Sequence, residues 1–501
     1  MHCGVQRLAA VAVTLALALA AALAAGLVAP APGSAAAPLA LSVSRAQLGP
    51  PVPAGFVGLA TEYWNIENEV GTDPAKPDTA FEQAVRNLAP YGDLNLRVGG
   101  DSTDWTWWPI PGMKQPPWVR WTMTPTWAAV TKRLVDDLHA HLIVGVNMEA
   151  GSVKIASAEV HEIQSTIGRS APITFELGNE PELYSHFAYY HDRAGAAVLG
   201  RPKSYSPAQM TAQWNQLAGA LPRIRLAGPG YSGLSALPDV GQFLTASHRL
   251  GVLTVHSYPL KSTRCSLGPR PQEAQLFAPS SLQGLAAGLR SWTSVAHYYR
   301  VGVRVDEMNS VTCGGQPGLS NSFGPALWAL NILPLYVEAG ANGVNFQSRP
   351  YTAQNLIQTL DTHAGWRVRV QPEYYGLLAF ASLTPPGSRL LAVSSPPNGL
   401  LAWAVRTPQG QMHVVLTNVG AGAKTVAVQA GGASGPATVE ALRSAAGGLR
   451  ASAGISLAGQ SLSPQTGELT GRLSPTTVKR SAGAYHVTVA PASAAIVSYR
   501  G

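Results

Sequence analysis

Two stretches of the sequence place a glutamate where an apolar run meets a polar loop. Glu180 follows the run 173–177 in Ile-Thr-Phe-Glu-Leu-Gly-Asn-Glu-Pro, and Glu307 follows the run 301–305 in Val-Gly-Val-Arg-Val-Asp-Glu. Short apolar runs rich in β-branched residues predict buried strands. In a barrel of parallel strands the carboxyl ends carry the chemistry. Two carboxylic acids at such ends are what hydrolysis of a glycosidic bond requires.

The two glutamates suit different roles. We expect Glu180 to act as general acid/base, with a pKa raised by partial burial and by a second carboxylate nearby. We expect Glu307 to stay ionised and to act as the nucleophile. Asp306 competes for that role, although strand alternation sends neighbouring residues to opposite faces. Glu182 lies beyond a proline and is interpreted as a loop residue.

Eight such runs alternate with helical patterns along the chain. The predicted strands are 55–61, 94–98, 142–146, 173–177, 224–227, 252–255, 301–305 and 343–346. Strands that alternate with helices predict a parallel sheet, and eight of them predict a closed barrel. We therefore expect an α/β fold, with a (β/α)8 TIM barrel over residues 55–384.

Beyond the predicted barrel the composition and the periodic pattern of the sequence change. From residue 385 helical patterns disappear, and the runs 400–405 and 412–417 flank the turn sequence Thr-Pro-Gln-Gly, which is a hairpin signal. We expect a β-sandwich over residues 385–501. Residues 38–54 contain an alternating run that is expected to join this sandwich as an extra strand.

The first 37 residues have the composition of a signal peptide. Arg7 precedes an apolar run over residues 8–28, and small residues follow at 33–37. Cleavage after this segment predicts a secreted protein, whereas an uncleaved segment would leave a membrane anchor. Two cysteines then remain, Cys265 and Cys313. In an exported protein such a pair suggests one disulfide, and the alternative is two free thiols.

The charge of the chain and its motifs limit which classes of partner and cofactor are expected. The net charge is +8, but no Lys/Arg-rich run is present, so nucleic acid is not an expected partner. The positive charge would suit an acidic polysaccharide. No H-E-x-x-H, P-loop or dinucleotide motif occurs, and neither a metal nor another cofactor is expected. The spacing around Ser232 differs from that of a nucleophile elbow.

Further polar residues follow the predicted strands, where sugar hydroxyls would need partners. These candidates are Asp101, Asp104, His256, Tyr258, Gln347 and Arg349. Holding the loops by hydrogen bonds is the alternative role. Five tryptophans also cluster between residues 105 and 121. They suit either stacking on sugar rings or packing on themselves.

The motifs together resemble glycoside hydrolase family 79, the β-glucuronidase and heparanase-like enzymes of clan A. The resemblance rests on Leu-Arg-Val-Gly-Gly-Asp-Ser-Thr-Asp at 96–104, Phe-Glu-Leu-Gly-Asn-Glu-Pro at 175–181, Val-His-Ser-Tyr at 255–258 and Glu-Met-Asn-Ser-Val-Thr-Cys-Gly-Gly at 307–315. It implies a retaining mechanism with Glu180 as acid/base and Glu307 as nucleophile. It also implies that Asn179 contacts the sugar 2-hydroxyl.

One position departs from this family. Members that bind glucuronate hold its carboxylate with a tyrosine and glycine amides just after the nucleophile. Here Thr312 stands at the position of the tyrosine, while Gly314 and Gly315 are present. A β-linked uronic acid and a neutral sugar therefore both stay open as substrates. A non-catalytic carbohydrate-binding protein on the same fold is the remaining alternative.

Overall fold

The computed structural model describes residues 39–168, 171–363, 365–396 and 399–501. The predicted signal peptide, 1–37, lies outside these residues. Within the described part of the chain, no helix combines the length and apolar character that crossing a membrane requires.

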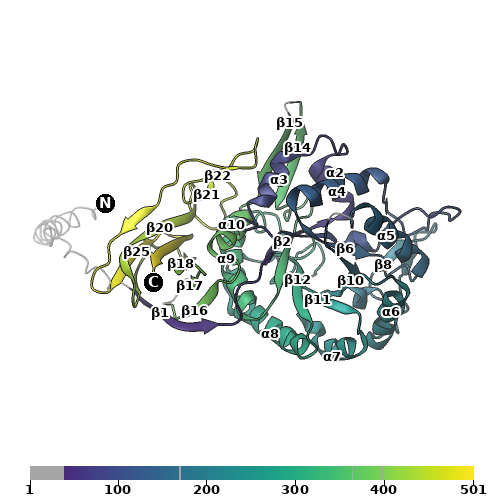
Figure 1. The fold of residues 1–501 in the computed structure, drawn as a ribbon, viewed down its shortest axis with the longest axis horizontal. Helices are drawn as coiled ribbons and strands as arrows, with labels where there is room; N and C mark the ends of the chain where they lie inside the picture. The colour runs from purple at the N-terminus through teal and green to yellow at the C-terminus, as the bar shows by residue number, and fades with distance from the viewer. Residues whose placement is uncertain (1–38, 169–170, 364, 397–398) are drawn as a thin grey trace, which may run out of the picture. The chain divides into compact units, whose positions relative to one another are not determined.

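Eight parallel strands close into a barrel (Figure 1). They are β2 (Val57–Glu62), β3 (Asn95–Gly99), β6 (His141–Val146), β7 (Ile173–Leu177), β10 (Arg225–Tyr231), β11 (Leu250–Ser257), β12 (Gly302–Met308) and β13 (Gly343–Gln347). Pairing of β13 with β2, in which Val344 lies opposite Val57, completes the ring. Each of the eight predicted runs forms one of these strands, so the predicted TIM barrel is confirmed.

Helices connect the barrel strands. They are α3 (Thr79–Arg86), α4 (Pro125–Leu138), α5 (Val153–Thr166), α6 (Pro207–Ala220), α7 (Leu237–Ala246), α8 (Gln283–Tyr298), α9 (Phe323–Glu338) and α10 (Glu373–Leu383), with the short α2 (Ile66–Val70) after β2. Several begin at a side chain that accepts from the first free amides, which stabilises the helix start. Asp78 does so for α3, Thr124 for α4, Ser152 for α5 and Ser206 for α6.

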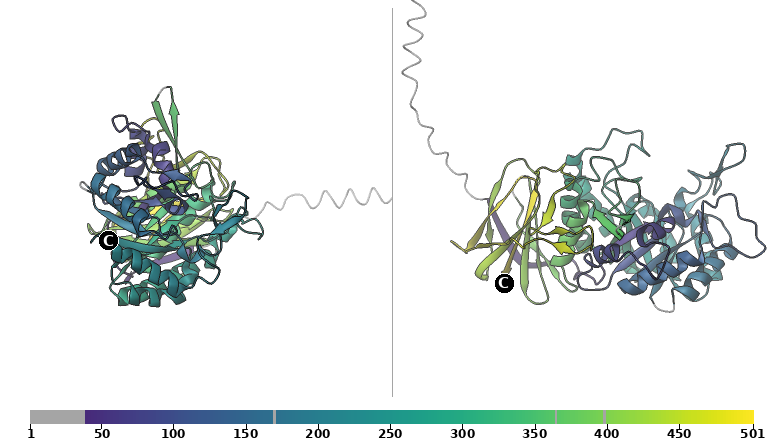
Figure 2. Two further views of the ribbon diagram at one scale, coloured as in Figure 1. Left: turned by 90° about the vertical axis from the view of Figure 1, so that its right-hand side faces the viewer. Right: turned by 90° about the horizontal axis from the view of Figure 1, so that it is seen from above.

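The C-terminal strands form a β-sandwich, as predicted (Figures 1 and 2). Its strands are β1 (Leu39–Leu48), β16 (Arg389–Val393), β17 (Leu400–Arg406), β18 (Gln411–Asn418), β19 (Lys424–Gln429), β20 (Ser434–Ser444), β21 (Ile455–Leu457), β24 (Thr476–Val478), β25 (Ala484–Val489) and β26 (Ser493–Arg500). The N-terminal strand β1 joins its two parts. Residues 39–42 pair with β19, and residues 43–48 pair with β16.

Strand β17 is buried on both faces. Ala404 belongs to the sandwich core, whereas its neighbours Trp403 and Val405 belong to the core that continues into the barrel. This alternation follows from the two-residue repeat of a strand. Helix α9 lies against this sheet, and Nδ2 of Asn331 donates to Oγ1 of Thr417 at 3.0 Å. Helix α9 is apolar on all of its faces, as expected for a helix that is covered on both sides.

Small strands in the loops were not predicted. They pair as β4 (Thr106–Trp107) with β5 (Trp121–Thr122), β8 (Ala188–His191) with β9 (Ala197–Leu199), β14 (Ile357–Thr362) with β15 (Gly365–Val370), and β22 (Ser461–Leu462) with β23 (Leu469–Thr470). The tryptophan-rich loop packs partly on itself. Trp107 and Trp118 form a separate small core with Ile155 and Tyr189.

Candidate active site

A cavity of about 870 Å³ opens where the barrel strands end. Its lining includes most residues predicted from strand ends: Asp101, Asp104, Asn179, Glu180, His256, Tyr258, Glu307, Gly314, Gln347 and Arg349. Gly315 does not line the cavity, because it is buried behind the residues that do. Its amide donates to the carbonyl of Thr312 at 3.0 Å, and its carbonyl accepts from Ser262.

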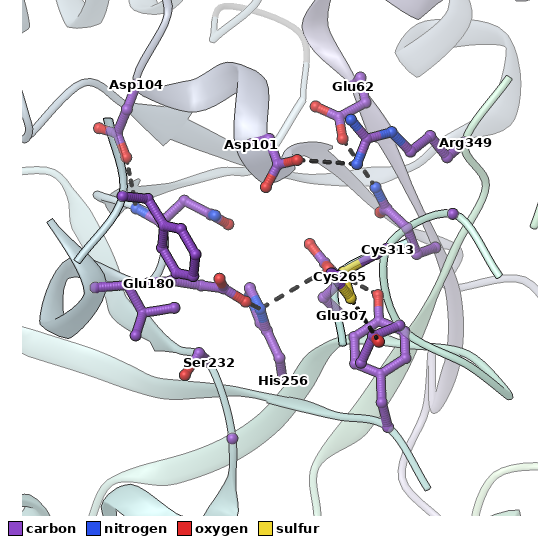
Figure 3. A pocket seen from close by; sticks show the side chains of 18 of the residues that line it. Glu62, Asp101, Asp104, Glu180, Ser232, His256, Cys265, Glu307, Cys313 and Arg349 are labelled. Carbon is purple, nitrogen blue, oxygen red and sulfur yellow. Dashed lines mark hydrogen bonds and ion pairs between the residues drawn. A yellow bond between two sulfur atoms is a disulfide. The ribbon is translucent and has the colours of Figure 1, made fainter. Parts of the chain in front are cut away.

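Glu180 is held by its backbone and by a histidine (Figure 3). It follows Gly178 at the end of β7 and has a left-handed φ of 51°, and its amide donates to the carbonyl of Gly230 at 2.9 Å. Oε1 of Glu180 lies 2.7 Å from Nδ1 of His256. Burial raises the pKa of Glu180, the charge of Glu307 adds to this effect, and His256 opposes it. Glu180 therefore favours the protonated form more than an ordinary glutamate does.

Glu307 lies at the end of β12 among hydrogen-bond donors. Tyr258 donates from its hydroxyl to Oε1 at 2.7 Å, and Nη1 of Arg97 donates to Oε2 at 2.9 Å. Burial alone would raise the pKa of Glu307, but the charges of His256 and Arg97 outweigh burial and lower it. The carboxylate is therefore stabilised in its ionised form.

The two carboxyl groups face one another across His256 (Figure 3). One oxygen of Glu180, one oxygen of Glu307 and one ring nitrogen of His256 all lie within 4.8 Å of one another. Burial disfavours protonation of the imidazole, but Glu307 and Glu180 outweigh burial and raise the pKa of His256 to about 10. Among the described residues this is the one group whose atoms are placed to hold a metal ion. These atoms already have hydrogen-bond partners in one another and in Tyr258 and Arg97.

Arg97, on β3, lies inside the barrel beneath the cavity and bonds to residues of the site. This role was not predicted from the sequence. The fully buried guanidinium of Arg97 donates from Nη2 to Oδ1 of Asn179 at 3.0 Å, and Nε lies 2.7 Å from Glu176 and 2.8 Å from Asp306. Asp306, the competing choice for the nucleophile, is fully buried in this pair and does not line the cavity. Burial and the charge of Glu176 raise the pKa of Asp306 well above its usual range. The structure therefore leaves Glu307 as the carboxylate that faces the cavity at the end of β12.

Asp104 holds the loops around Glu180 together by hydrogen bonds. Its Oδ1 accepts from the amides of Met148 and Glu149 at 3.0 and 3.1 Å. Its Oδ2 accepts from the amide of Asn179 at 3.2 Å and from the hydroxyl of Tyr184 at 2.9 Å. With four donors already in place, Asp104 positions the segment that carries Glu180.

Glu62 lines the cavity and is a second residue of the site that the sequence did not single out. It ends β2, is 1% exposed, and accepts from the amide of Ser102 at 2.9 Å and from Nε2 of Gln347 at 3.2 Å. Burial and the nearby charge of Asp101 raise the pKa of Glu62 to about 7. Its position at a strand end, like that of Glu180, was the signal that could have identified it.

The predicted disulfide between Cys265 and Cys313 is present. It joins the loop after β11 to the loop after β12, and both cysteines line the cavity (Figure 3). Thr312, at the position expected to hold a tyrosine, accepts at its hydroxyl from the amide of Ser262 at 3.1 Å. The disulfide therefore fixes the cavity wall beside Glu307.

Comparison with known proteins gives the fold but not a family. No family model matches the chain. A β-glucuronidase of Neurospora crassa is 23% identical over 390 residues, which are 70% of this chain and 66% of that protein. The chain therefore spans slightly less than two thirds of this relative.

Solved structures are similar over nearly the whole chain. A 4-O-α-L-rhamnosyl-β-D-glucuronidase from Fusarium oxysporum has a TM-score of 0.68 at 16% identity, covering 92% of this chain and 100% of that one. A family 51 arabinofuranosidase from Xanthomonas axonopodis has a TM-score of 0.62 at 15% identity, with coverage of 92% and 100%. A family 30 xylanase from Talaromyces cellulolyticus has a TM-score of 0.52 at 11% identity, with the same coverage. The chain therefore shares its fold with these three glycoside hydrolases.

Proposed function

We propose that this protein is a retaining β-glycosidase that hydrolyses β-linked glycosides by double displacement, with a β-glucuronide as its preferred substrate. The observation that carries the proposal is the close approach of Glu180 and Glu307, whose facing atoms lie within 4.8 Å. Retaining glycosidases separate their carboxyl groups by about 5–5.5 Å, whereas inverting enzymes leave about 6.5–9.5 Å for a water molecule. The spacing supports retention.

The opposite pKa shifts support the assignment of roles. Glu180, with its raised pKa, protonates the glycosidic oxygen as the bond to the leaving group breaks. Glu307, with its lowered pKa, attacks the anomeric carbon and forms a covalent glycosyl-enzyme. Glu180, now ionised, then takes a proton from a water molecule that attacks the same carbon and releases Glu307.

The residues around the pair serve these steps. Arg97 and Tyr258 orient Glu307 and hold it ionised until it attacks. His256 fixes the side chain of Glu180 on the leaving-group side. Asn179, whose Oδ1 accepts from Arg97, keeps its amide nitrogen for the sugar 2-hydroxyl.

The choice of sugar rests on similarity and on chemistry. Both the curated relative and the structure with the TM-score of 0.68 have glucuronidase names, which supports a uronic acid substrate. A neutral β-glycoside is the second candidate, because Thr312 replaces the tyrosine expected in uronate binding. Export of the chain belongs to the same proposal and rests on the composition of residues 1–37. N-terminal sequencing of the exported protein tests it.

The test is hydrolysis of nitrophenyl β-glucuronide, β-glucoside, β-galactoside and β-xyloside by the wild-type chain, Glu180→Gln and Glu307→Gln. We expect turnover of the glucuronide that Glu307→Gln abolishes and Glu180→Gln strongly reduces. Glu182→Gln is the matched control, because Glu182 is a half-buried glutamate in the same loop that accepts from the amide of Ser232 and does not line the cavity. A folded wild-type chain that turns over none of the four glycosides would favour a binding role instead.

A further inference from the structure

The cavity continues past Glu180 on the side where the leaving group of the reaction must lie. In the proposed mechanism Glu307 attacks one face of the anomeric carbon, and Glu180 protonates the oxygen that departs from the opposite face. Asp104 lies at this end of the cavity, where its Oδ2 accepts from the amide of Asn179, the residue before Glu180 (Figure 3). Neighbours of Asp104 and Glu180 that also line the cavity are Trp105, Arg120, Glu149, Leu183, Phe187 and Tyr189.

Glu149 is a buried carboxyl group without a partner at this end of the cavity. It follows β6, and its amide donates to Oδ1 of Asp104 at 3.1 Å. Glu149 is 9% exposed and lines the cavity, yet within the described ranges neither of its carboxyl oxygens has a hydrogen bond or an ion pair. Buried polar groups nearly always have a partner, so a free one that faces a cavity indicates a bonding group of a ligand.

The fold leaves room for this carboxyl group and keeps it uncharged. A Cβ placed on Gly200, which follows β9, would collide with Oε1 of Glu149. Arg201 forms no ion pair with the carboxyl group, because its guanidinium donates to the carbonyls of Met148 and Glu149 instead. Burial and the charge of Asp104 raise the pKa of Glu149 to about 9, although Arg201 opposes them. A carboxylic acid that is neutral near pH 7 both donates and accepts, which suits an uncharged hydroxyl rather than a cation.

An exposed aromatic ring is the second feature of this end. Phe187, in the loop between Glu180 and β8, lines the cavity although it is 66% exposed. The ring of Trp105 is already covered on one face by Arg120, whose guanidinium carbon lies 4.4 Å from the ring centre. A sugar presents C–H groups on its ring face and hydroxyls at its edge, so an open aromatic ring and a free carboxyl group together match its chemistry.

We propose that Glu149 and Phe187 form a subsite for a leaving group that is itself a sugar, with Glu149 bonded to its hydroxyls and Phe187 stacked on its ring. The proposal rests on the proposed function and deepens it, because it makes the substrate a disaccharide or oligosaccharide rather than a glycoside of a simple alcohol. In the second step of a retaining mechanism the same subsite can bind a sugar acceptor in place of water. The acceptor hydroxyl then attacks the anomeric carbon, Glu180 takes its proton, and the bond to Glu307 breaks.

The test measures this transfer to a sugar. The nitrophenyl β-glycoside that the wild-type chain hydrolyses serves as donor, glucose and xylose serve as acceptors, and disaccharide formed is compared with nitrophenol released. We expect disaccharide from the wild-type chain and a ratio about 10-fold lower in Glu149→Leu, as for loss of a hydrogen bond. Nitrophenol release without acceptor should be unchanged, which also shows that the variant is folded. Glu149→Gln is the matched variant, because its amide still donates and accepts, and it should keep most of the transfer.

The aromatic contact is tested in the same assay. Phe187→Ala should also lower the ratio of disaccharide to nitrophenol. Tyr298→Ala is the control, because Tyr298 is 83% exposed and does not line the cavity. A hydrolysing wild-type chain that transfers to neither sugar, or an equal ratio in the wild-type chain and Glu149→Leu, would overturn the subsite and leave the glycosidase proposal intact.

A binding measurement separates the subsite from the proposed function. Saturation-transfer NMR reports binding of cellobiose and xylobiose whether or not any glycoside is hydrolysed. Binding that Glu149→Leu abolishes and Tyr298→Ala keeps supports the subsite, and if no glycoside is turned over the proposed function alone is then wrong. Absence of binding, or equal binding in the wild-type chain and Glu149→Leu, would contradict the subsite.

Discussion

Nη1 of Arg97 donates to Oε2 of Glu307 at 2.9 Å, and this contact joins the second barrel strand to the seventh. The same guanidinium lies 2.7 Å from Glu176 and 2.8 Å from Asp306. One buried cation thus organises three carboxyl groups on two other strands. Together with His256 it keeps Glu307 ionised, and it pairs with the fully buried Asp306.

Replacing Arg97 should destabilise the whole barrel. Arg97→Gln leaves the buried carboxyl groups of Glu176 and Asp306 without their cation, and breaking a buried ion pair in this way costs about 3–5 kcal/mol. The midpoint of thermal unfolding measures the loss. Arg290→Gln is the control, because its pair with Glu338 is at the surface, with the arginine side chain 53% exposed, and is worth about 1 kcal/mol or less. Equal shifts in the two variants would contradict this account of Arg97.

Tyr258→Phe should change the pH profile on one side only. The tyrosine hydroxyl donates to ionised Glu307 and helps to lower its pKa, so its loss raises that pKa. Activity requires ionised Glu307, and therefore the acidic limb of kcat/KM should move to higher pH. The basic limb, which reports Glu180, should stay in place. In Tyr336→Phe neither limb should move, because Tyr336 is a buried tyrosine that does not line the cavity and whose hydroxyl bonds to Ser257.

Stability should fall as the pH rises from mildly acidic to alkaline values. Burial raises the pKa of Glu69 and of Glu373 to about 8, above the 4.5 of an exposed glutamate. A raised pKa in the folded state means that the folded chain binds more protons, so the stability that these two groups contribute is complete below pH 4.5 and is lost as the pH rises towards 8. Thermal midpoints measured from pH 5 to 8 should decline.

The variant Glu69→Gln tests the source of this slope. Its side-chain oxygen can still accept from Thr61 and Asn65, but the residue no longer titrates. The decline in thermal midpoint should therefore be smaller than in the wild-type chain. The exposed Glu468 provides the matched substitution, Glu468→Gln, which should leave the slope as it is. A slope that is identical in all three proteins would contradict the role of Glu69.

Removing the disulfide should cost stability and loosen the cavity wall. Cys265 and Cys313 are 48 residues apart, and a cross-link over that distance is worth about 4 kcal/mol in the chain-entropy model. The double variant Cys265→Ala/Cys313→Ala should melt at a lower temperature and show a higher KM for the hydrolysed glycoside. The wild-type chain under reducing conditions should behave in the same way. An unchanged KM in both would mean that the loops keep their positions without the bond.

Much of this architecture follows from local pattern. The eight barrel strands were predictable because each is a short apolar run, and Glu180 and Glu307 were predictable because each stands where such a run ends. The disulfide followed from a pair of cysteines in a chain with a signal-like leader. The strands and the two catalytic candidates can therefore be predicted from residues that are neighbours in the sequence.

The contacts that hold the catalytic candidates in place could not be predicted, because they depend on how the barrel closes. Arg97 meets Glu176 and Asp306 only because three separate strands converge on one point, and no spacing in the sequence reports that convergence. Asp104 lies at a strand end like the candidate ligands, yet the folded loops supply it with four donors. Arg264 lies in an irregular loop, which the disulfide and hydrogen bonds from Ser262 and Thr263 join to the loop after β12.

The most direct test of the central claim is the configuration of the first sugar released. Proton NMR during hydrolysis of the active β-glycoside distinguishes the two anomers before they interconvert. A retaining mechanism through Glu180 and Glu307 predicts that the β-anomer appears first and that the α-anomer follows only by mutarotation. Initial release of the α-anomer would contradict the account, because inversion requires a water molecule between two carboxyl groups that stand about 6.5–9.5 Å apart.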